Sequence, residues 1–265
     1  FEFMRKAFLV GILLAIIIPL IGVVVVFRRL SMIGAALSHT SLAGVAGGLI
    51  LGINPILGPV VTCTLAAFGF EGIRKKFPKY AELSIAIIMS AGIGLAGVLS
   101  GFVQNAANFN SFLFGSIVAI SDFELFLVIV ISGAVILASK LLYKELLAIS
   151  FDETGARLSG VPVELVNFIF TILTAVTVSI AARTVGALIV SSLMGVPVAC
   201  AMLFGRSYFQ TVVYSILFGI GFTVAGLTIA FYCGLKPGGT IVLTGVCSFV
   251  LLLLIRRLCG HRIDE

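Results

Sequence analysis

Charged side chains are scarce in this chain of 265 residues. Asp, Glu, Lys and Arg make up 11% of the sequence, 60% of the residues are hydrophobic, and the mean hydropathy is +1.26. Soluble domains carry about 25% charged and about 45–50% apolar residues. This composition excludes a soluble globular protein and indicates an integral membrane protein.

The sequence also lacks the motifs of several enzyme classes. It contains no GxxxxGK[ST] nucleotide-binding loop, no HExxH zinc motif and no CxxC pair among its five cysteines. No Asp or Glu lies in the middle of a hydrophobic segment, where proton-coupled carriers place acidic relays. We therefore expect the chain not to be an enzyme, and a transport step would need a partner that supplies energy.

Long hydrophobic segments are what the chain does contain. They lie at 8–27, 32–52, 54–70, 83–103, 122–139, 165–182, 186–205, 209–233 and 239–255, with a soft boundary between the sixth and the seventh. A membrane helix needs about 20 apolar residues, and its backbone amides must be satisfied within the segment. The sequence predicts an all-α, polytopic transmembrane bundle of about eight or nine spans, in one domain over 1–265. Glycines in these segments are expected to let helices pack closely.

The basic residues predict the orientation of this bundle. If the N-terminus is outside, 13 of the 17 Lys and Arg residues fall on the inner side, and only Arg5, Lys6, Arg183 and Lys236 fall on the outer side. Cytoplasmic loops carry an excess of Lys and Arg, so we expect a multi-pass protein with a cytoplasmic C-terminus. This asymmetry also explains the net charge of +6, which therefore does not indicate a nucleic-acid partner.

Residues near the segment ends carry specific expectations. Arg183 is expected to extend its guanidinium to the membrane surface, and Asp122 and Glu124 are expected to be solvated at the outer boundary. Pro197 lacks a backbone donor, so it is expected to break or kink its helix. The outer connection 104–121 is expected to form either a re-entrant helix or a capping loop.

Histidine is scarce too, which draws attention to His39. It is one of two histidines and the only one inside a segment of membrane length. Neutral imidazole binds zinc and several other transition metals, and ionisable groups within membrane segments are functional candidates. A single histidine cannot hold a metal alone, so a site would need ligands from other spans or from a second copy. The alternative is a structural hydrogen bond from His39 to a neighbouring helix.

The longest inner connection, 140–164, has the pattern of a short helix. The predicted helix begins with two acids, which suit a helix N-terminus. Small residues follow on one of its faces, and a glycine and a proline end it. The residues concerned are Asp152, Glu153, Gly155, Ala156, Arg157, Gly160, Val161 and Pro162. A short surface helix of this shape fits a groove on a partner, whereas the alternative is a solvated loop.

Five stretches, in order along nearly the whole chain, resemble the permease subunits of ATP-binding-cassette (ABC) importers for zinc, manganese and related divalent metals. They are FRRLSMIGAALSHTSLAGVAGGLILGINP, FLFGSI, ISFDETGARLSGVPVELVNFIFTILTAVTV, VGALIVSSLMGVPVACAM and LKPGGTIVL. The resemblance implies a symmetric homodimer in a bacterial plasma membrane. It also implies a cytoplasmic ATP-binding subunit for each copy, an extracytoplasmic metal-binding protein, and zinc or manganese as transported ion with no tightly bound cofactor.

The resemblance also implies roles for two regions. Segment 152–162 resembles the coupling helix that contacts the ATPase, with matches at Asp152, Ala156, Gly160 and Pro162. His39 matches a histidine on the metal pathway, but Ala35 stands where the family has an aspartate.

Two observations favour zinc. A histidine without a carboxylate suits zinc better than the harder manganese, and VSSLMGVPVACAM and SGVPV look more like zinc permeases of Gram-positive bacteria. The alternatives are a manganese or iron permease and, less favoured, a siderophore or cobalamin permease or a membrane scaffold.

Overall fold

The structure is a computed structural model that describes residues 2–52, 56–77, 80–103 and 121–258, and in these residues it contains helices and no strand. The long helices are α1 (Glu2–Phe27), α2 (Ile33–Leu51), α3 (Leu57–Lys76), α4 (Ala81–Ser100), α6 (Asp122–Leu141), α9 (Val163–Ala181), α10 (Ala187–Met202), α11 (Tyr208–Cys233) and α12 (Pro237–Leu258). Two short helices, α7 (Tyr143–Phe151) and α8 (Glu153–Leu158), follow α6, and a π-helical turn, η1 (Ala182–Gly186), joins α9 to α10.

The predicted all-α membrane bundle is confirmed. Seven of the long helices are long and apolar enough to cross a membrane, with η1 extending the α9 span. The other two, α3 and α10, occupy the remaining predicted segments. The expected re-entrant helix or capping loop at 104–121 lies, apart from Ser121, outside the described residues.

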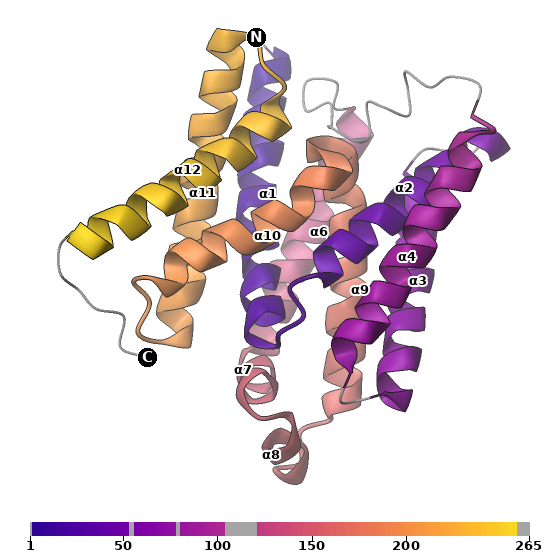
Figure 1. Cartoon of the computed structure of the whole chain (residues 1–265), viewed down its shortest axis with the longest axis vertical. Helices are drawn as coiled ribbons and strands as arrows, with labels where there is room; N and C mark the ends of the chain where they lie inside the picture. Colours follow the sequence, from indigo (N-terminus) through magenta and orange to yellow (C-terminus); the bar gives the residue numbers. More distant parts are fainter. Residues whose placement is uncertain (1, 53–55, 78–79, 104–120, 259–265) are drawn as a thin grey trace.

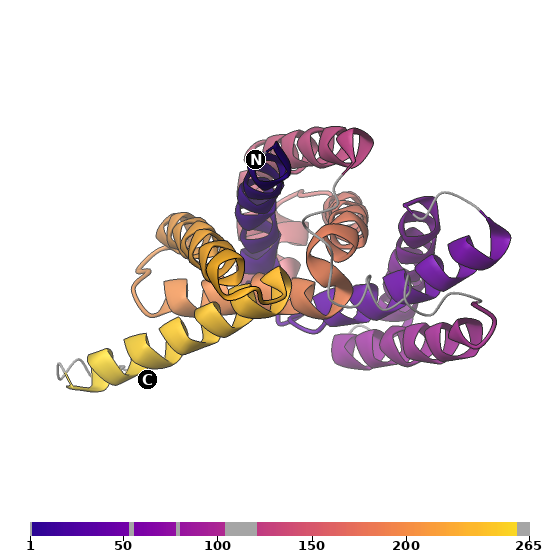
Figure 2. The ribbon, with the colours of Figure 1, turned by 90° about the horizontal axis from the view of Figure 1, so that it is seen from above.

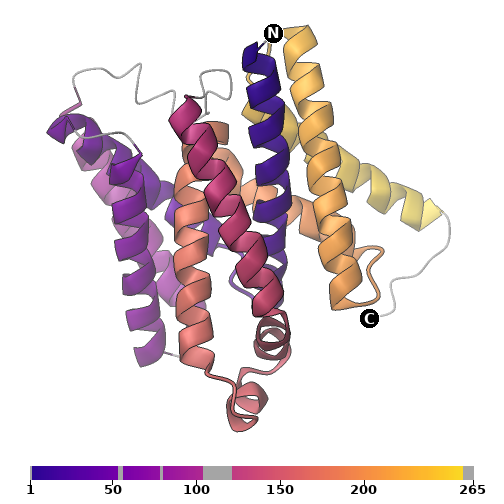
Figure 3. The ribbon, with the colours of Figure 1, turned by 180° about the vertical axis from the view of Figure 1, so that it is seen from behind.

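The helices run between two ends of the molecule. Figure 1 shows α2, α10 and α12 crossing obliquely in front of α1, α9 and α11, and Figure 2 shows α12, α10, α2 and α4 along one side. About two thirds or more of the α1, α2 and α9 spans is buried, whereas less than a quarter of the α4, α6 and α12 spans is buried. The two short helices α7 and α8 protrude at one end (Figures 1 and 3). We call this the α8 end of the bundle.

The change of direction between α9 and α10 occurs at Gly186, which confirms the soft boundary there. Its φ of 112° is accessible to glycine and strained for other residues. Of the two outcomes expected at Pro197, a break or a kink, the break does not occur, because α10 continues through this residue, as α1 continues through Pro19. Membrane helices tolerate proline where neighbouring groups satisfy the freed carbonyl.

An ion pair at the opposite end corrects two expectations. Arg183 does not extend to the surface: its Nε donates to Glu124 Oε1 over 2.8 Å. Glu124 is not solvated either, since it is only 6% exposed and its Oε2 accepts from the Ser121 backbone over 2.9 Å. The two opposite charges compensate each other where little water reaches them. Asp122 is exposed as expected, and it pairs with Lys6 at 2.6 Å.

Glycines bring the backbone of α2 close to α3 and α4. A Cβ at Gly44 would collide with the Gly58 backbone, and a Cβ at Gly92 would lie 2.7 Å from Thr40 Oγ1 and 2.9 Å from Thr40 N. This is the close packing of small residues expected for membrane helices. Some glycines in the spans do not contribute to this packing: a Cβ at Gly94 would contact no other atom.

Gly92→Leu should therefore lower the thermal unfolding midpoint of the detergent-purified protein. The added side chain has to separate α4 from the backbone of α2, and such overfilling costs about 1–3 kcal/mol. Gly94→Leu, two residues away in the same helix, is the matched control and should leave the midpoint unchanged. Equal lowering in both variants would contradict the close contact between α2 and α4.

Candidate functional site

The predicted short helix of the 140–164 connection is present as α8. Asp152 is its N-cap, and the Oδ1 of this residue accepts from the Thr154 backbone over 3.0 Å. Gly155 leaves room for the cap, because a Cβ there would collide with the Asp152 carboxylate. Gly160 follows the helix with a φ of 84°, and Pro162 is the N-cap of α9. The sequence pattern thus matches the local structure at both ends.

The side chains of α8 divide between the bundle and the surroundings. Ala156 is buried in the hydrophobic core and packs α8 against the bundle. Arg157, Gly160 and Pro162 are exposed, and Val161 is half-buried. Leu158 is 85% exposed, although it is apolar and lies on the protruding helix. A single exposed apolar side chain is common on protein surfaces, so Leu158 is of interest here because it lies on the protruding α8. The sequence analysis missed Leu158, and its signal was an apolar residue among charged and small ones.

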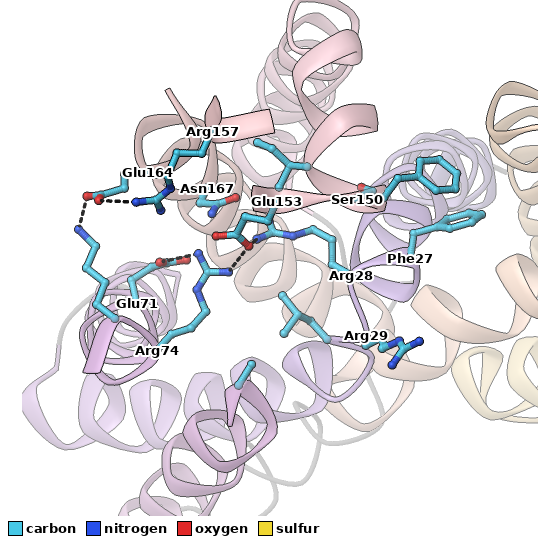
Figure 4. Close-up of a pocket in the computed structure, with 15 residues that line it drawn as sticks. Phe27, Arg28, Arg29, Glu71, Arg74, Ser150, Glu153, Arg157, Glu164 and Asn167 are labelled. Atoms are coloured by element: carbon cyan, nitrogen blue, oxygen red, sulfur yellow. Dashed lines mark hydrogen bonds and ion pairs between the residues drawn. The ribbon is translucent and has the colours of Figure 1, made fainter. Parts of the chain in front are cut away.

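A charged cavity of about 790 Å³ lies beside α8 (Figure 4). It is bordered by the last residues of α1, by α3 and α7, and by the start of α9. Its charged lining residues are Arg28, Arg29, Glu71, Arg74, Lys75, Glu153, Arg157 and Glu164. The α8 end of the bundle is therefore polar inside as well as at its surface.

Ion pairs across this cavity connect α8 to two long helices. Glu153 Oε2 lies 3.8 Å from Arg28 Nη2, just after α1, and 3.8 Å from Arg74 Nη1 in α3. Arg74 also pairs with Glu71 at 3.4 Å. Figure 4 shows Glu153 between the two arginines. A displacement of α8 would therefore act directly on the ends of α1 and α3.

A second pair of contacts joins α8, α3 and the start of α9. Glu164 lies 2.7 Å from Lys75 Nζ and 3.9 Å from Arg157 Nη1. All three side chains are more than half exposed, so water and salt weaken these contacts. They contribute less to holding α8 than the contacts of Glu153 with the more buried arginines.

Two buried groups of the cavity have unused hydrogen-bonding capacity. Arg28 Nη2 has no hydrogen-bond partner in the described part of the chain, and neither do the two amide atoms of Asn167, which is 1% exposed. Burial and the neighbouring Arg74 lower the pKa of Arg28 to about 10, against the opposing effect of Glu153 and Glu71. Arg28 thus keeps its charge at neutral pH and depends on Glu153 as a counter-ion.

The connection from Arg28 to α2 is short. Arg29 adopts the left-handed conformation with a φ of 57°, and the Leu30 backbone donates to Val25 O over 2.9 Å. Helix α2 then begins at Ile33. This compact turn places Arg28 at the junction between α1 and the helix that carries His39.

His39 lies half-buried in the first half of α2, with Ala35 one turn before it. Within the described residues, no group of three or more His, Cys, Asp and Glu side chains could hold a metal ion. The described part of one copy therefore places no such group of three ligands around His39, and it does not group His39 with the α8 residues.

The fold and this site can now be compared with known proteins. The model of the ABC 3 transport family matches residues 1–256. The chain belongs to this family. A probable metal transport system membrane protein of Treponema pallidum is 35% identical over 257 residues, which cover 96% of this chain and 95% of the relative.

Other relatives of the chain are named for zinc or for manganese. The high-affinity zinc uptake system membrane protein ZnuB of Haemophilus influenzae is 30% identical, over 96% of this chain and 97% of its own length. The manganese import system permease protein ScaB of Streptococcus parasanguinis is 29% identical, over 95% and 90%. PsaBC from Streptococcus pneumoniae, solved in complex with a Fab, superposes with a TM-score of 0.83 at 28% identity, over 95% and 91%.

The recognised family likeness is thus confirmed. The chain is a membrane protein of the ABC 3 transport family, and its relatives are named as membrane or permease proteins of metal, zinc or manganese transport systems. The relatives include both metals, so they do not distinguish zinc from manganese.

Replacing Glu153 tests the contacts that hold α8. Glu153→Gln removes the counter-charge shared by Arg28 and Arg74, and Glu153 is 43% exposed, so the loss is that of a partly screened pair. Hydrogen exchange of the backbone amides of 153–158 should become about two- to fivefold faster. The control is Glu82→Gln, an exposed acid at the start of α4. Unchanged exchange in Glu153→Gln would contradict the linking role.

Proposed function

We propose that two copies of this chain form the translocation pathway of an ATP-driven zinc importer, and that α8 is the coupling helix. The observation that carries this proposal is the protruding α8, which has an exposed Leu158 on its surface and ion pairs to α1 and α3 behind it. A cytoplasmic ATP-binding subunit would contact the surface of α8, and an extracytoplasmic protein would deliver the metal at the other end.

The placement of charge supports a cytoplasmic α8 end. Basic residues gather there from the ends of α1, α3 and α6, from the start of α7 and from α8 itself. Arg256, in the last turn of α12, donates to Leu203 O just after α10. Since cytoplasmic segments are rich in Lys and Arg, the α8 end and the C-terminus lie in the cytoplasm of the bacterial cell, and α8 faces the ATPase.

Coupling would follow the contacts around Glu153. Closure of the ATPase shifts α8, and α8 acts on Arg28 and Arg74 through their shared carboxylate. Arg28 lies in the short connection between α1 and α2, so its movement changes the tilt of α2. Because α2 carries His39, ATP-driven movement reaches the metal pathway without a long chain of intermediate contacts.

His39 from each copy would contact the metal during its passage. One imidazole binds a metal weakly, and a conduit must release what it binds. Ala35 removes the carboxylate that the family pattern places one turn earlier, which leaves softer nitrogen ligands and favours zinc. Manganese is the second candidate, because relatives such as ScaB are named for it.

The docking surface of α8 is tested by two substitutions. Gly160→Trp places a bulky residue at a φ of 84°, and Leu158→Asp puts a charge on the exposed apolar contact. Each should reduce ATPase co-purification and ATP-driven zinc uptake at least about tenfold while the permease remains dimeric, since a charge buried at an interface is costly. Leu235→Asp, at the opposite end of the bundle, is the control and should retain both. Normal uptake by Gly160→Trp would argue against a coupling role of α8.

The metal pathway is tested by uptake of radioactive zinc into liposomes that contain the permease, its ATPase and its binding protein. His39→Ala should lose most uptake while keeping ATPase co-purification, because the pathway loses its nitrogen ligand but α8 is unchanged. Ala35→Asp should increase competition by excess manganese, since a carboxylate suits the harder ion. Full uptake by His39→Ala would assign this residue to helix packing instead.

A further inference from the structure

A second cavity borders the first turn of α7, whereas the charged cavity borders its last turn. The second cavity has a volume of about 700 Å³ and is bordered by α1, α6, α7 and α11. Figure 3 shows these four helices together at the rear of the molecule, where α7 lies below the end of α6. Neither the coupling contacts nor His39 involves this groove, so the proposed transport mechanism leaves it unexplained.

The groove changes character along its length. Ile16 of α1, Ile136 of α6 and Ile216 of α11 make its part within the bundle apolar. At the α8 end it is bordered by Lys140 and Lys144, both exposed. A groove with an apolar part at membrane depth and lysines at the membrane boundary has the polarity of a phospholipid, whose acyl chain and phosphate separate in the same way.

Glu145 is an acidic residue in the same groove, and it favours a ligand whose polar part carries a hydrogen-bond donor. It follows Lys144 in α7, and its Oε2 is buried without a hydrogen-bond partner in the described residues. Hydrogen bonds to charged groups are stronger than those between neutral groups, so a ligand whose hydroxyl donates to the Glu145 carboxylate would be stabilised there. With two lysines and one glutamate, the polar end has a net charge of +1, which complements a single phosphodiester.

We propose that this groove is a binding site for an anionic phospholipid of the phosphatidylglycerol type. Its phosphodiester pairs with Lys140 and Lys144, a glycerol hydroxyl of its headgroup donates to Glu145, and an acyl chain fills the apolar part. The occupant is a lipid because α6, which forms one wall, is mostly exposed and carries large apolar side chains such as Phe126, Ile129 and Leu137. A surface of this kind in a membrane protein faces acyl chains.

A lipid in this groove would also affect the position of α8, because the groove is bordered by α7. Helix α7 carries Lys144 and Glu145 on the groove, and α7 leads through Asp152 directly into α8. A bound headgroup would therefore fix α7 against α1 and α11, and so fix the point from which α8 protrudes. The lipid site itself needs only the membrane insertion of the chain and does not depend on the identity of the metal.

Native mass spectrometry of the intact permease–ATPase complex tests the site. The complex is released from nanodiscs that contain equal amounts of phosphatidylglycerol, phosphatidylethanolamine and phosphatidylcholine, and the retained lipids are counted. Phosphatidylglycerol should be retained in preference to the two zwitterionic lipids. Lys140→Gln with Lys144→Gln should lower its retention about tenfold, since each lysine near a membrane surface adds attraction for anionic lipid.

The matched control is Lys75→Gln with Lys76→Gln, which removes the same charge from the end of α3 and should leave retention unchanged. Ile216→Trp fills the apolar part without changing any charge and should also lower retention. Equal retention of the three lipids, or equal loss in the α3 control, would overturn the proposal. Unchanged retention in Ile216→Trp would place any bound phosphatidylglycerol outside the groove. Monodisperse elution of each variant establishes that it is folded.

Discussion

The position of α8 in the bundle depends on the contact of Glu153 with Arg28 and Arg74. Helix α8 has six residues and one well-buried side chain, Ala156, so it has little apolar area to hold it. Its position is set by the Asp152 cap, the covalent connections to α7 and α9, and the carboxylate of Glu153. An ion pair suits this task, because the attraction between two charges depends on their distance and not on their orientation, and therefore persists while the helix tilts.

Much of the fold follows from the sequence, because membrane solvation imposes it. Segments of about 20 apolar residues have to become helices, and glycines such as Gly44 and Gly92 permit close approach of their backbones. The same holds for α8, whose ends are set by local chemistry at Asp152, Gly160 and Pro162. Such features depend on neighbours along the chain, and the sequence displays those neighbours directly.

The features that could not be predicted depend on partners that are distant along the chain. Arg183 and Glu124 are 59 residues apart, and each alone has the appearance of a solvated boundary residue. The link from Glu153 to Arg28 and Arg74 likewise joins three separate segments. Pro197 differs for the opposite reason: a local rule allows a break or a kink, whereas α10 continues through this residue, as membrane helices can where neighbouring groups satisfy the freed carbonyl.

The two ends of the bundle treat charge differently, and this difference bears on how it moves. At the end opposite α8, Arg183 and the buried Glu124 lie 2.8 Å apart beside the capping box of Ser121, so a donor and an acceptor are fully matched. At the α8 end, Glu153 lies 3.8 Å from each of two arginines, and buried Asn167 lacks hydrogen-bond partners in the described residues. Separating a matched, buried pair is expensive, whereas a loosely matched and partly hydrated set rearranges at low cost. Under the coupling role that we propose for α8, this end is therefore the part of the bundle where a small input of energy from a partner changes the helix arrangement first.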